Sequence, residues 1–582
     1  MLFQKVTMSF CFKSPPKKSL FAVAVFLVIS TSTQAQISVP DPASELIRQQ
    51  QREEALQHQM ETTVQEPGMQ IKPMPLAVVK IPEETPCFTI HKIELDGELA
   101  KKFQWALKAA NRDSEKQPDP ALNRCLGANG INIVMGRIQN AIIEKGYITS
   151  RVVAAEQDLT QGVLKLTFIP GKINAIRWAE GSGKRVSWRS ALPMREGDVL
   201  NLRDLEQALE TFKRVPTTDV DIQIEPAGET GQSDLVIYWK ETFPFRVNFS
   251  VDDSGSRETS RYQGALTISY DNPLALNDLL YFSYNQGLGD GKGGDSTGYS
   301  LHYSVPIKGN WLLSFNTSYY KYHQMIAGIN EEYDYKGSSE NIDVTLSRRI
   351  YRDATKRLNF YAKGWTRRSK NYIEGTEIQN QKRRTSGWEI GVDYRQFIGS
   401  AILNTSLSYR RGTGALNAMR SPLETTGEGT SRMKVYSLNA SLMFPFQFGK
   451  QQFRYMGTFR VQWNDTPLVP QDQFSIGGRY TVRGFDGRSS LMAERGWLLR
   501  NDLGWQVFTT GQELYWGLDF GNVAGPSVHN QVGQNLTGTV LGLRGSITKY
   551  MSYDAFVGTW LHKPDNFKTS RWTSGFSLNF AF

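Results

Sequence analysis

The sequence predicts a mainly β membrane protein: an antiparallel transmembrane β-barrel of about 16 strands, preceded by two small α+β domains and an N-terminal helix. Three observations predict this fold class. The chain of 582 residues begins with an export signal, one order of elements then occurs twice, and apolar and polar residues alternate over 243–582. Such a length also exceeds that of one ordinary domain.

Residues 1–35 are expected to be a signal peptide. Two lysines precede the apolar run 20–29, and small residues at 33–35 offer a cleavage site. The run is too short to cross a bilayer as a helix, which disfavours the alternative of an N-terminal anchor. The rest of the sequence contains no apolar window long enough for a transmembrane helix.

Residues 36–60 are expected to form a polar helix, and 61–85 a linker. Asp41 suits the N-cap, Pro42 suits the first helical position, and strong helix formers follow. Few positions are apolar, so the helix cannot bury a face in a protein core. It is either a loosely structured tail or a helix that lies in a water-filled space.

Two small domains are predicted at 86–171 and 172–242, each with the order β-α-α-β-β. The first has a strand, two helices and two strands at 88–95, 101–111, 131–145, 151–154 and 163–169. The second repeats this order at 173–179, 187–192, 202–213, 219–225 and 234–240. Because the same order recurs over a similar length, the two segments form an internal repeat.

Cys87 and Cys125 both fall in the first small domain, and Cys11 would leave with the signal peptide. Exported proteins fold in an oxidising compartment, so we expect a Cys87–Cys125 disulfide. Two buried free thiols are the alternative. Closing this loop would stabilise the domain by roughly 3–4 kcal/mol at most.

Residues 243–582 alternate with period two in segments of roughly 8–12 residues, which is typical of membrane strands. One such segment places Phe453, Tyr455, Phe459, Val461 and Trp463 on one face, and Arg454, Thr458, Arg460, Gln462 and Asn464 on the other. A soluble β-sandwich also alternates, but Arg, Asn and Gln are too polar for its packed core. The many aromatic residues, including 13 Trp and 24 Tyr, suit two interfacial girdles.

The composition argues against other classes of function. The net charge of +10 is spread along the chain without a recognition motif, so we expect no nucleic acid as a partner. The histidines are scattered and no Gly-x-Ser-x-Gly motif occurs, so we expect no enzyme, no catalytic residues, no cofactor and no metal site.

The segment 477–485, Gly-Gly-Arg-Tyr-Thr-Val-Arg-Gly-Phe, contains a short motif formed by Val482, Arg483, Gly484 and Phe485. It resembles the Val-Arg-Gly-Tyr/Phe loop motif of the outer-membrane assembly and two-partner secretion superfamily. The two small domains resemble polypeptide-transport-associated (POTRA) domains. Together with the polar helix, they resemble the transporters of two-partner secretion, of the haemolysin and filamentous-haemagglutinin activator type.

This resemblance implies roles for individual residues. Arg483 would lie at the tip of a loop, about 466–493, that folds back into the lumen and pairs with an inward-facing acid. Asp519 is the matching residue, and the alternation of its strand also places it on the polar face. Asp502 and Glu494 are weaker candidates for the same network.

The resemblance also implies a function. The protein would be a monomeric pore in outer-membrane lipid that exports an unfolded, β-helical exoprotein without ATP, with the N-terminal helix as a plug. The cargo could be a haemolysin, an adhesin or a contact-dependent toxin. A general assembly factor for outer-membrane proteins is the main alternative. A passive porin would leave the two small domains unexplained.

Overall fold

The computed structural model describes residues 42–62, 80–111, 118–183, 185–289, 294–327, 331–507 and 511–582. The predicted signal peptide and most of the predicted linker lie outside these residues. Residues 80–85 pack on the first small domain, where the backbone N–H of the buried Ile81 donates to Asp119 at 3.0 Å.

The first small domain has two sheets around one apolar core. Its elements are β1 (Phe88–Ile90), β2 (Lys92–Asp96), α2 (Ala100–Phe103), the 3-10 helix η1 (Gln104–Asn111), β3 (Arg124–Leu126), α3 (Ala128–Glu144), β4 (Arg151–Val153) and β5 (Val163–Ile169). Strands β2, β5 and β4 form one sheet, and β1 and β3 form the other. Phe103, Ile138, Leu164 and Phe168 are buried in this core.

Two predicted elements of this domain differ from the structure. The single strand expected at 88–95 breaks at His91, because β1 pairs with β3 while the N–H groups of His91 and Lys92 donate to the carbonyl of Gly162. The helix expected at 101–111 is a short α-helix that continues as a 3-10 helix. The expected disulfide is confirmed: Cys87 and Cys125 are bonded, with their Cα atoms 5.3 Å apart.

The second small domain repeats the order of the first. It contains β6 (Lys172–Trp178), α4 (Trp188–Ala191), α5 (Leu202–Lys213), β7 (Thr218–Pro226) and β8 (Gln232–Glu241), with β8 between β6 and β7. The Asn201 side chain caps α5 by accepting from the N–H of Arg203 at 2.8 Å. Leu205, Leu209 and Phe212 of this helix are buried against the sheet.

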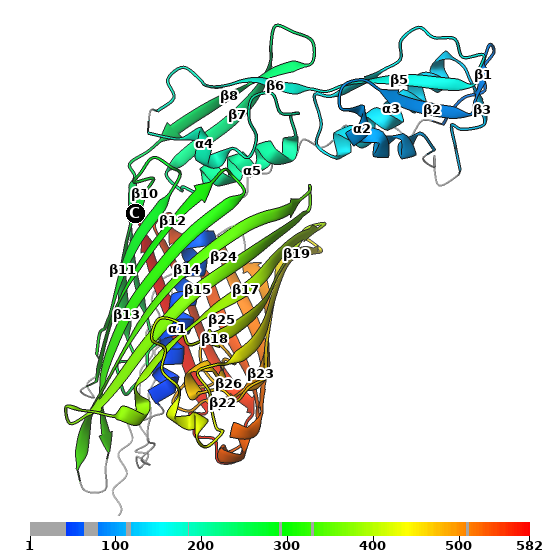
Figure 1. The fold of residues 1–582 in the computed structure, drawn as a ribbon. Coiled ribbons are helices and arrows are strands. Elements are labelled where there is room, and N and C mark those ends of the chain that lie inside the picture. Colours follow the sequence, from blue (N-terminus) through cyan, green and yellow to red (C-terminus); the bar gives the residue numbers. More distant parts are fainter. Residues whose placement is uncertain are drawn as a thin grey trace, which may run out of the picture. The chain divides into compact units, whose positions relative to one another are not determined.

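Sixteen long strands and the two-residue β16 form a closed barrel within the described residues, which confirms the predicted fold class. They are β9 (Phe245–Asp252), β10 (Gln263–Asp271), β11 (Leu279–Gly287), β12 (Asp295–Ile307), β13 (Trp311–Ala327), β14 (Glu332–Arg352), β15 (Lys356–Ile373), β16 (Thr376–Glu377), β17 (Arg383–Ile398), β18 (Ala401–Thr413), β19 (Lys434–Phe448), β20 (Gln451–Asn464), β23 (Arg495–Val507), β24 (Gln512–Ala524), β25 (Asn535–Thr548), β26 (Met551–His562) and β27 (Trp572–Ala581). Antiparallel pairing of β27 with β9 closes the cylinder. Figure 1 shows its tilted strands in green to red.

The two faces of the barrel differ in chemistry. Phe249, Leu266 and Phe282 face outward and are exposed, while Thr267 and Ser283 face inward and share a hydrogen bond of 2.9 Å. Outward-facing aromatic rings contact one another along neighbouring strands, as in the series Tyr409, Tyr436 and Trp463, with centroids 4.8 and 5.5 Å apart. No helix in the described part of the chain is long and apolar enough to cross a membrane.

Helix α5 of the second small domain contacts the ends of β14 and β15 and the turn between β12 and β13. Glu210 forms ion pairs with Arg349 at 3.0 Å, Arg352 at 2.5 Å and Arg357 at 3.1 Å. The Gln207 side chain donates to the carbonyl of Gly309, in the β12–β13 turn, at 2.8 Å. A carboxylate between three guanidinium groups is therefore the main charged contact of α5 with the barrel.

Candidate functional site

The segment between β20 and β23 folds into the lumen of the barrel. It contains the 3-10 helix η4 (Pro470–Asp472) and the short strands β21 (Phe474–Ile476) and β22 (Leu491–Ala493). Its apolar side chains pack against residues of the barrel wall, in a cluster that includes Ile476, Val482, Phe485, Leu491, Leu498, Val523 and Leu536. Two residues of the Val482–Phe485 motif thus hold the loop by apolar contacts.

The charged residue of the motif, Arg483, binds two carboxylates of the barrel wall. Its Nε donates to Oδ2 of Asp519 at 2.7 Å, and its Nη2 donates to Oδ1 of Asp519 at 2.8 Å. Nη2 also donates to Asp502 at 2.5 Å, and the backbone N–H of Arg483 donates to Asp519 at 2.9 Å. The side chains of Arg483 and Asp519 are 4% and 1% exposed, so water does not compete for this bidentate pair.

Glycines allow the loop backbone to lie against the wall. Gly484 has φ +94°, in the left-handed region, and a Cβ there would lie 2.5 Å from the carbonyl oxygen of Thr559. A Cβ at Gly538 would lie 1.8 Å from the carbonyl oxygen of Arg483, and one at Gly517 would lie 2.7 Å from its Nη2. Larger residues at these positions would displace the loop from β24, β25 and β26.

The network also includes residues that sequence reasoning missed. Arg544 on β25 donates to Asp502 at 3.2 Å, and Arg500 on β23 lies 3.9 Å from Asp519. Their inward positions in alternating strands were a usable signal. Glu494 does not join this network, because its carboxylate accepts from the hydroxyl and the backbone N–H of Ser527.

Helix α1 (Pro42–Thr62) lies inside the barrel, where Figure 1 shows it in dark blue. It contacts several strands through polar groups. The Tyr320 hydroxyl on β13 donates to Glu45 at 2.5 Å, and Arg52 donates to Gln263 on β10 at 3.3 Å. Because the lumen wall is polar, a helix with few apolar residues finds partners on most of its faces.

The loop also contacts the helix directly. The Arg48 side chain donates to the carbonyl of Gly487 at 3.1 Å, and Ala43 and Ile47 pack against Met492. The helix and the motif loop therefore occupy the lumen together and share an interface.

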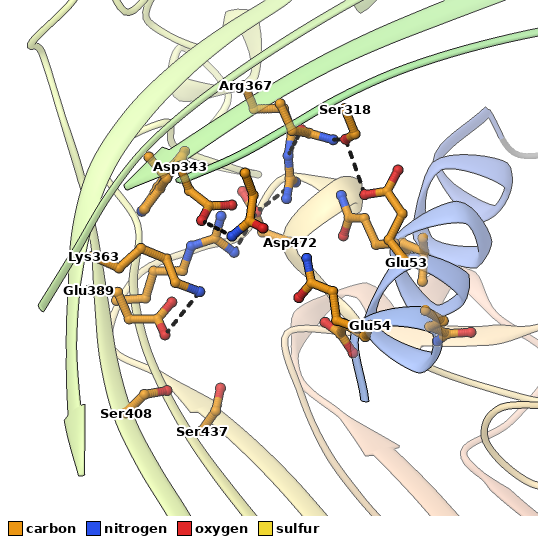
Figure 2. Close-up of a pocket in the computed structure, with 18 of the residues that line it drawn as sticks. Glu53, Glu54, Ser318, Asp343, Lys363, Arg367, Glu389, Ser408, Ser437 and Asp472 are labelled. Carbon is orange, nitrogen blue, oxygen red and sulfur yellow. Dashed lines mark hydrogen bonds and ion pairs between the residues drawn. The ribbon is translucent and has the colours of Figure 1, made fainter. Parts of the chain in front are cut away.

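A cavity of about 420 Å³ lies beside the helix within the lumen. Figure 2 shows Glu53 and Glu54 of α1 on one side of it, and Lys363, Arg367 and Glu389 of the barrel wall on the other. Glu53 accepts from Ser318 at 3.1 Å and Lys363 lies 3.9 Å from Glu389. No cluster of His, Cys, Asp and Glu that could hold a metal occurs among the described residues.

Comparisons with known proteins agree with this architecture. The family model of haemolysin secretion/activation protein ShlB/FhaC/HecB matches residues 231–545. A model of ShlB-type POTRA domains matches 88–171, and a second POTRA model matches 172–226. The two small domains are therefore POTRA domains, and we call them POTRA 1 and POTRA 2.

Individual relatives cover from about two thirds to nearly all of the chain. The outer membrane transporter CdiB-2 of Burkholderia pseudomallei is 38% identical over 92% of this chain and 93% of its own length. The hemolysin transporter protein ShlB of Serratia marcescens is 25% identical over 65% of this chain and 67% of its own. The structure of CdiB from Acinetobacter baumannii, at 31% identity, matches with a TM-score of 0.79 over 94% of this chain and 100% of that one. The chain therefore belongs to the haemolysin secretion/activation family of ShlB, FhaC and HecB.

Proposed function

We propose that this protein carries one unfolded partner exoprotein from the periplasm, through the barrel lumen, to the cell surface without ATP. It is an outer-membrane transporter of two-partner secretion, with its POTRA domains in the periplasm. The mechanism rests on how the two segments inside the lumen are held. Arg483 holds the motif loop rigidly, while α1 is held by scattered polar contacts. The loop is thus a fixed part of the pore, and the helix is the part that leaves.

Cargo recognition would use the free edges of the POTRA sheets. Within the described residues no strand pairs with the outer edge of β2 or of β7. An unfolded segment can add there as an extra strand through main-chain hydrogen bonds, which bind many sequences. This mode suits a long cargo that enters the pore progressively.

A site-specific photo-crosslinker tests recognition at the edge of β7. Asp221 on β7 and Tyr238 on the central strand β8 are register partners, and both are exposed on the same face of the sheet. A crosslinker at Asp221 should capture cargo during secretion, and one at Tyr238 should capture much less. Equal capture at the two positions would argue against strand addition at this edge.

Energy for transport would come from the cargo. The periplasm supplies no ATP, and a β-helical cargo that folds outside the cell stacks each repeat on the previous one, which makes its return unfavourable. A cargo variant whose repeats cannot fold should stall in the pore. Export of this variant at the normal rate would exclude folding as the energy source.

The sequence similarity to individual relatives supports a proposal for the class of cargo. The sequence identity of this chain to the transporter CdiB-2 is higher than its identity to the hemolysin transporter ShlB. We therefore propose that its cargo belongs to the class that CdiB transporters export. Cells without this protein should lose one surface exoprotein and keep their other outer-membrane proteins. Loss of many outer-membrane proteins would instead indicate an assembly factor.

The role of the motif arginine can be tested in the same cells. Arg483→Ala leaves two buried carboxylates without their partner, so the loop should leave its site while the barrel stays closed. Secretion of the exoprotein should fall by about ten-fold or more. Arg488→Ala is the matched control, because this arginine of the same loop is 42% exposed. Normal secretion by Arg483→Ala would remove the assignment.

A further inference from the structure

A band of basic side chains follows the outer surface of the barrel near its extracellular end. The register places these residues on outward positions of β13, β15, β17, β18, β19 and β23, and we call them the basic band: Lys321, Lys370, Arg384, Arg411, Lys434 and Arg495. Their sequence neighbours Tyr320, Arg410 and Val435 face the lumen, which fixes the outward direction of the alternate positions.

Four of the six members of the basic band have the same spacing from an aromatic residue of the girdle. On β13, Lys321 lies two residues beyond Tyr319, toward the extracellular end of the strand, and on β18 Arg411 lies two residues beyond Tyr409. The same offset recurs on two further strands, for the pairs Lys434 and Tyr436, and Arg495 and Trp497. Two residues of a strand correspond to about 7 Å. The charges therefore lie just outside the depth at which aromatic rings mark the edge of the hydrocarbon.

The charges of the basic band are not neutralised by the protein. None of its members forms an ion pair with a carboxylate in the part of the chain that the structure describes. Nearby bases that do have such partners are Lys336, 2.6 Å from Asp334, and Arg368, 3.5 Å from Glu340. Arg495 does donate to the side-chain oxygen of Asn464, at 3.0 Å. The basic band thus presents charged donors without a carboxylate partner.

The basic band is interrupted at β24 and β25. At the extracellular ends of β24 and β25, the outward positions carry the uncharged residues Asn522 and Asn535, whose amides bond to each other at 2.7 Å. Just beyond the ends of β26 and β27, Lys563 and Arg571 lie over the ring of Trp560 instead. The continuous run of outward bases therefore belongs to the strands β13–β23.

We propose that the basic band is a docking surface for the phosphate groups of the phosphorylated glycolipid of the outer leaflet, with acyl chains against the apolar strands below. Phosphates at this depth meet Lys and Arg donors directly, and Arg can bind phosphate with two parallel hydrogen bonds. The docked lipid would fix the tilt and depth of β13–β23. The inference uses the membrane location and is independent of the cargo pathway.

The test compares two four-site variants of the full-length protein purified in detergent. The band variant carries Lys321→Gln, Arg411→Gln, Lys434→Gln and Arg495→Gln, and the control variant carries Lys308→Gln, Arg348→Gln, Lys450→Gln and Lys549→Gln near the periplasmic turns. Native mass spectrometry with diphosphoryl lipid A measures the bound lipid. The band variant should bind it at least about ten-fold more weakly than the wild type, and the control variant should bind like the wild type.

Further probes distinguish the source of the phosphate. Monophosphoryl lipid A should bind the wild type more weakly than the diphosphoryl form, and phosphatidylglycerol or inorganic phosphate should not displace it. Equal binding of lipid A by the wild type and the band variant would overturn the proposal, as would displacement by either competitor. If the four-site variant does not fold, the pair Arg411→Gln and Lys434→Gln gives the same comparison. Secretion that persists without lipid binding would leave the transport function intact.

Discussion

At the scale of single residues, the motif loop lies very close to the backbone of β25. A Cβ at Gly538 would meet the carbonyl of Arg483, so Gly538→Ala should push the loop away and separate Arg483 from its carboxylates. Loss of this buried pair costs roughly 3 kcal/mol or more, and we expect secretion to fall strongly while the barrel still folds. Secretion assays of the exoprotein measure the effect.

Gly478→Ala is the control for that variant. It lies in the same loop, its φ is not positive, and a Cβ there meets nothing within 4 Å. Its secretion should match that of the wild type. Similar defects in both variants would mean that any change in the loop is harmful and that the contact at Gly538 has no special role.

The sequence alone predicts the central pair of the site, Arg483 and Asp519, but the arginines around this pair were not predicted. The alternation along β24 placed Asp519 in the lumen, where it contacts Arg483. The same rule applied to β23 and β25 would have added Arg500 and Arg544. Glu494 and Asp502 are close in sequence, and both are candidates for the network on that ground. Asp502 lies on β23, whereas Glu494 lies at the end of the loop and its carboxylate faces Ser527.

At the scale of elements, α1 is held by contacts of unequal strength. Glu45 is buried and accepts from Tyr320 and Arg48, whereas the side chain of Glu54 is 61% exposed where it pairs with Arg460. A buried charged hydrogen bond contributes about 1.5–3 kcal/mol, and an exposed ion pair about 0–1 kcal/mol. Glu45→Gln should therefore release the helix more often than Glu54→Gln.

Planar-bilayer recordings measure this release as ion conductance through the lumen. Deletion of residues 42–62 should give a large and constant conductance, because the helix fills much of the lumen. Glu45→Gln should show open events about ten-fold more often than the wild type, and Glu54→Gln should resemble the wild type. Unchanged conductance after the deletion would show that α1 does not plug the pore.

The elements themselves were predictable where one local signal sufficed. The bounds of α5 and β5 match the predicted ranges because caps and period define them within a few residues. The break between β1 and β2 was not predictable, since it depends on pairing with β3 and on the carbonyl of Gly162, far along the chain. The pattern of residues at 88–95 alone predicts an extended segment, but it does not show with which strand each half of the segment pairs.

At the scale of the whole molecule, the ion pairs of Glu210 join POTRA 2 to the barrel across more than a hundred residues of sequence. No local pattern in the sequence predicts such a contact. Burial alone would raise the pKa of Glu210, but the guanidinium groups of Arg349, Arg357 and Arg352 lower the pKa to about 2 from an ordinary value of 4.5. The charged form is thus strongly favoured in the docked state.

This pKa shift predicts how POTRA 2 responds to acid. Because the pKa of Glu210 is lowered in the docked state, its ion pairs stabilise that state fully above about pH 4.5. This stabilisation is lost as the pH falls toward 2, and the pKa shift corresponds to roughly 3 kcal/mol at most.

Spin labels at Gln223→Cys and Lys450→Cys report the distance between POTRA 2 and the barrel. The distribution should be narrow for the wild type at pH 7 and should broaden toward pH 2, whereas Glu210→Gln should already be broad at pH 7. Glu229→Gln, an exposed change in the same domain, should follow the wild type. If Glu210→Gln kept the narrow distribution at pH 7, apolar and backbone contacts such as that of Gln207 with Gly309 would hold POTRA 2 without the ion pairs.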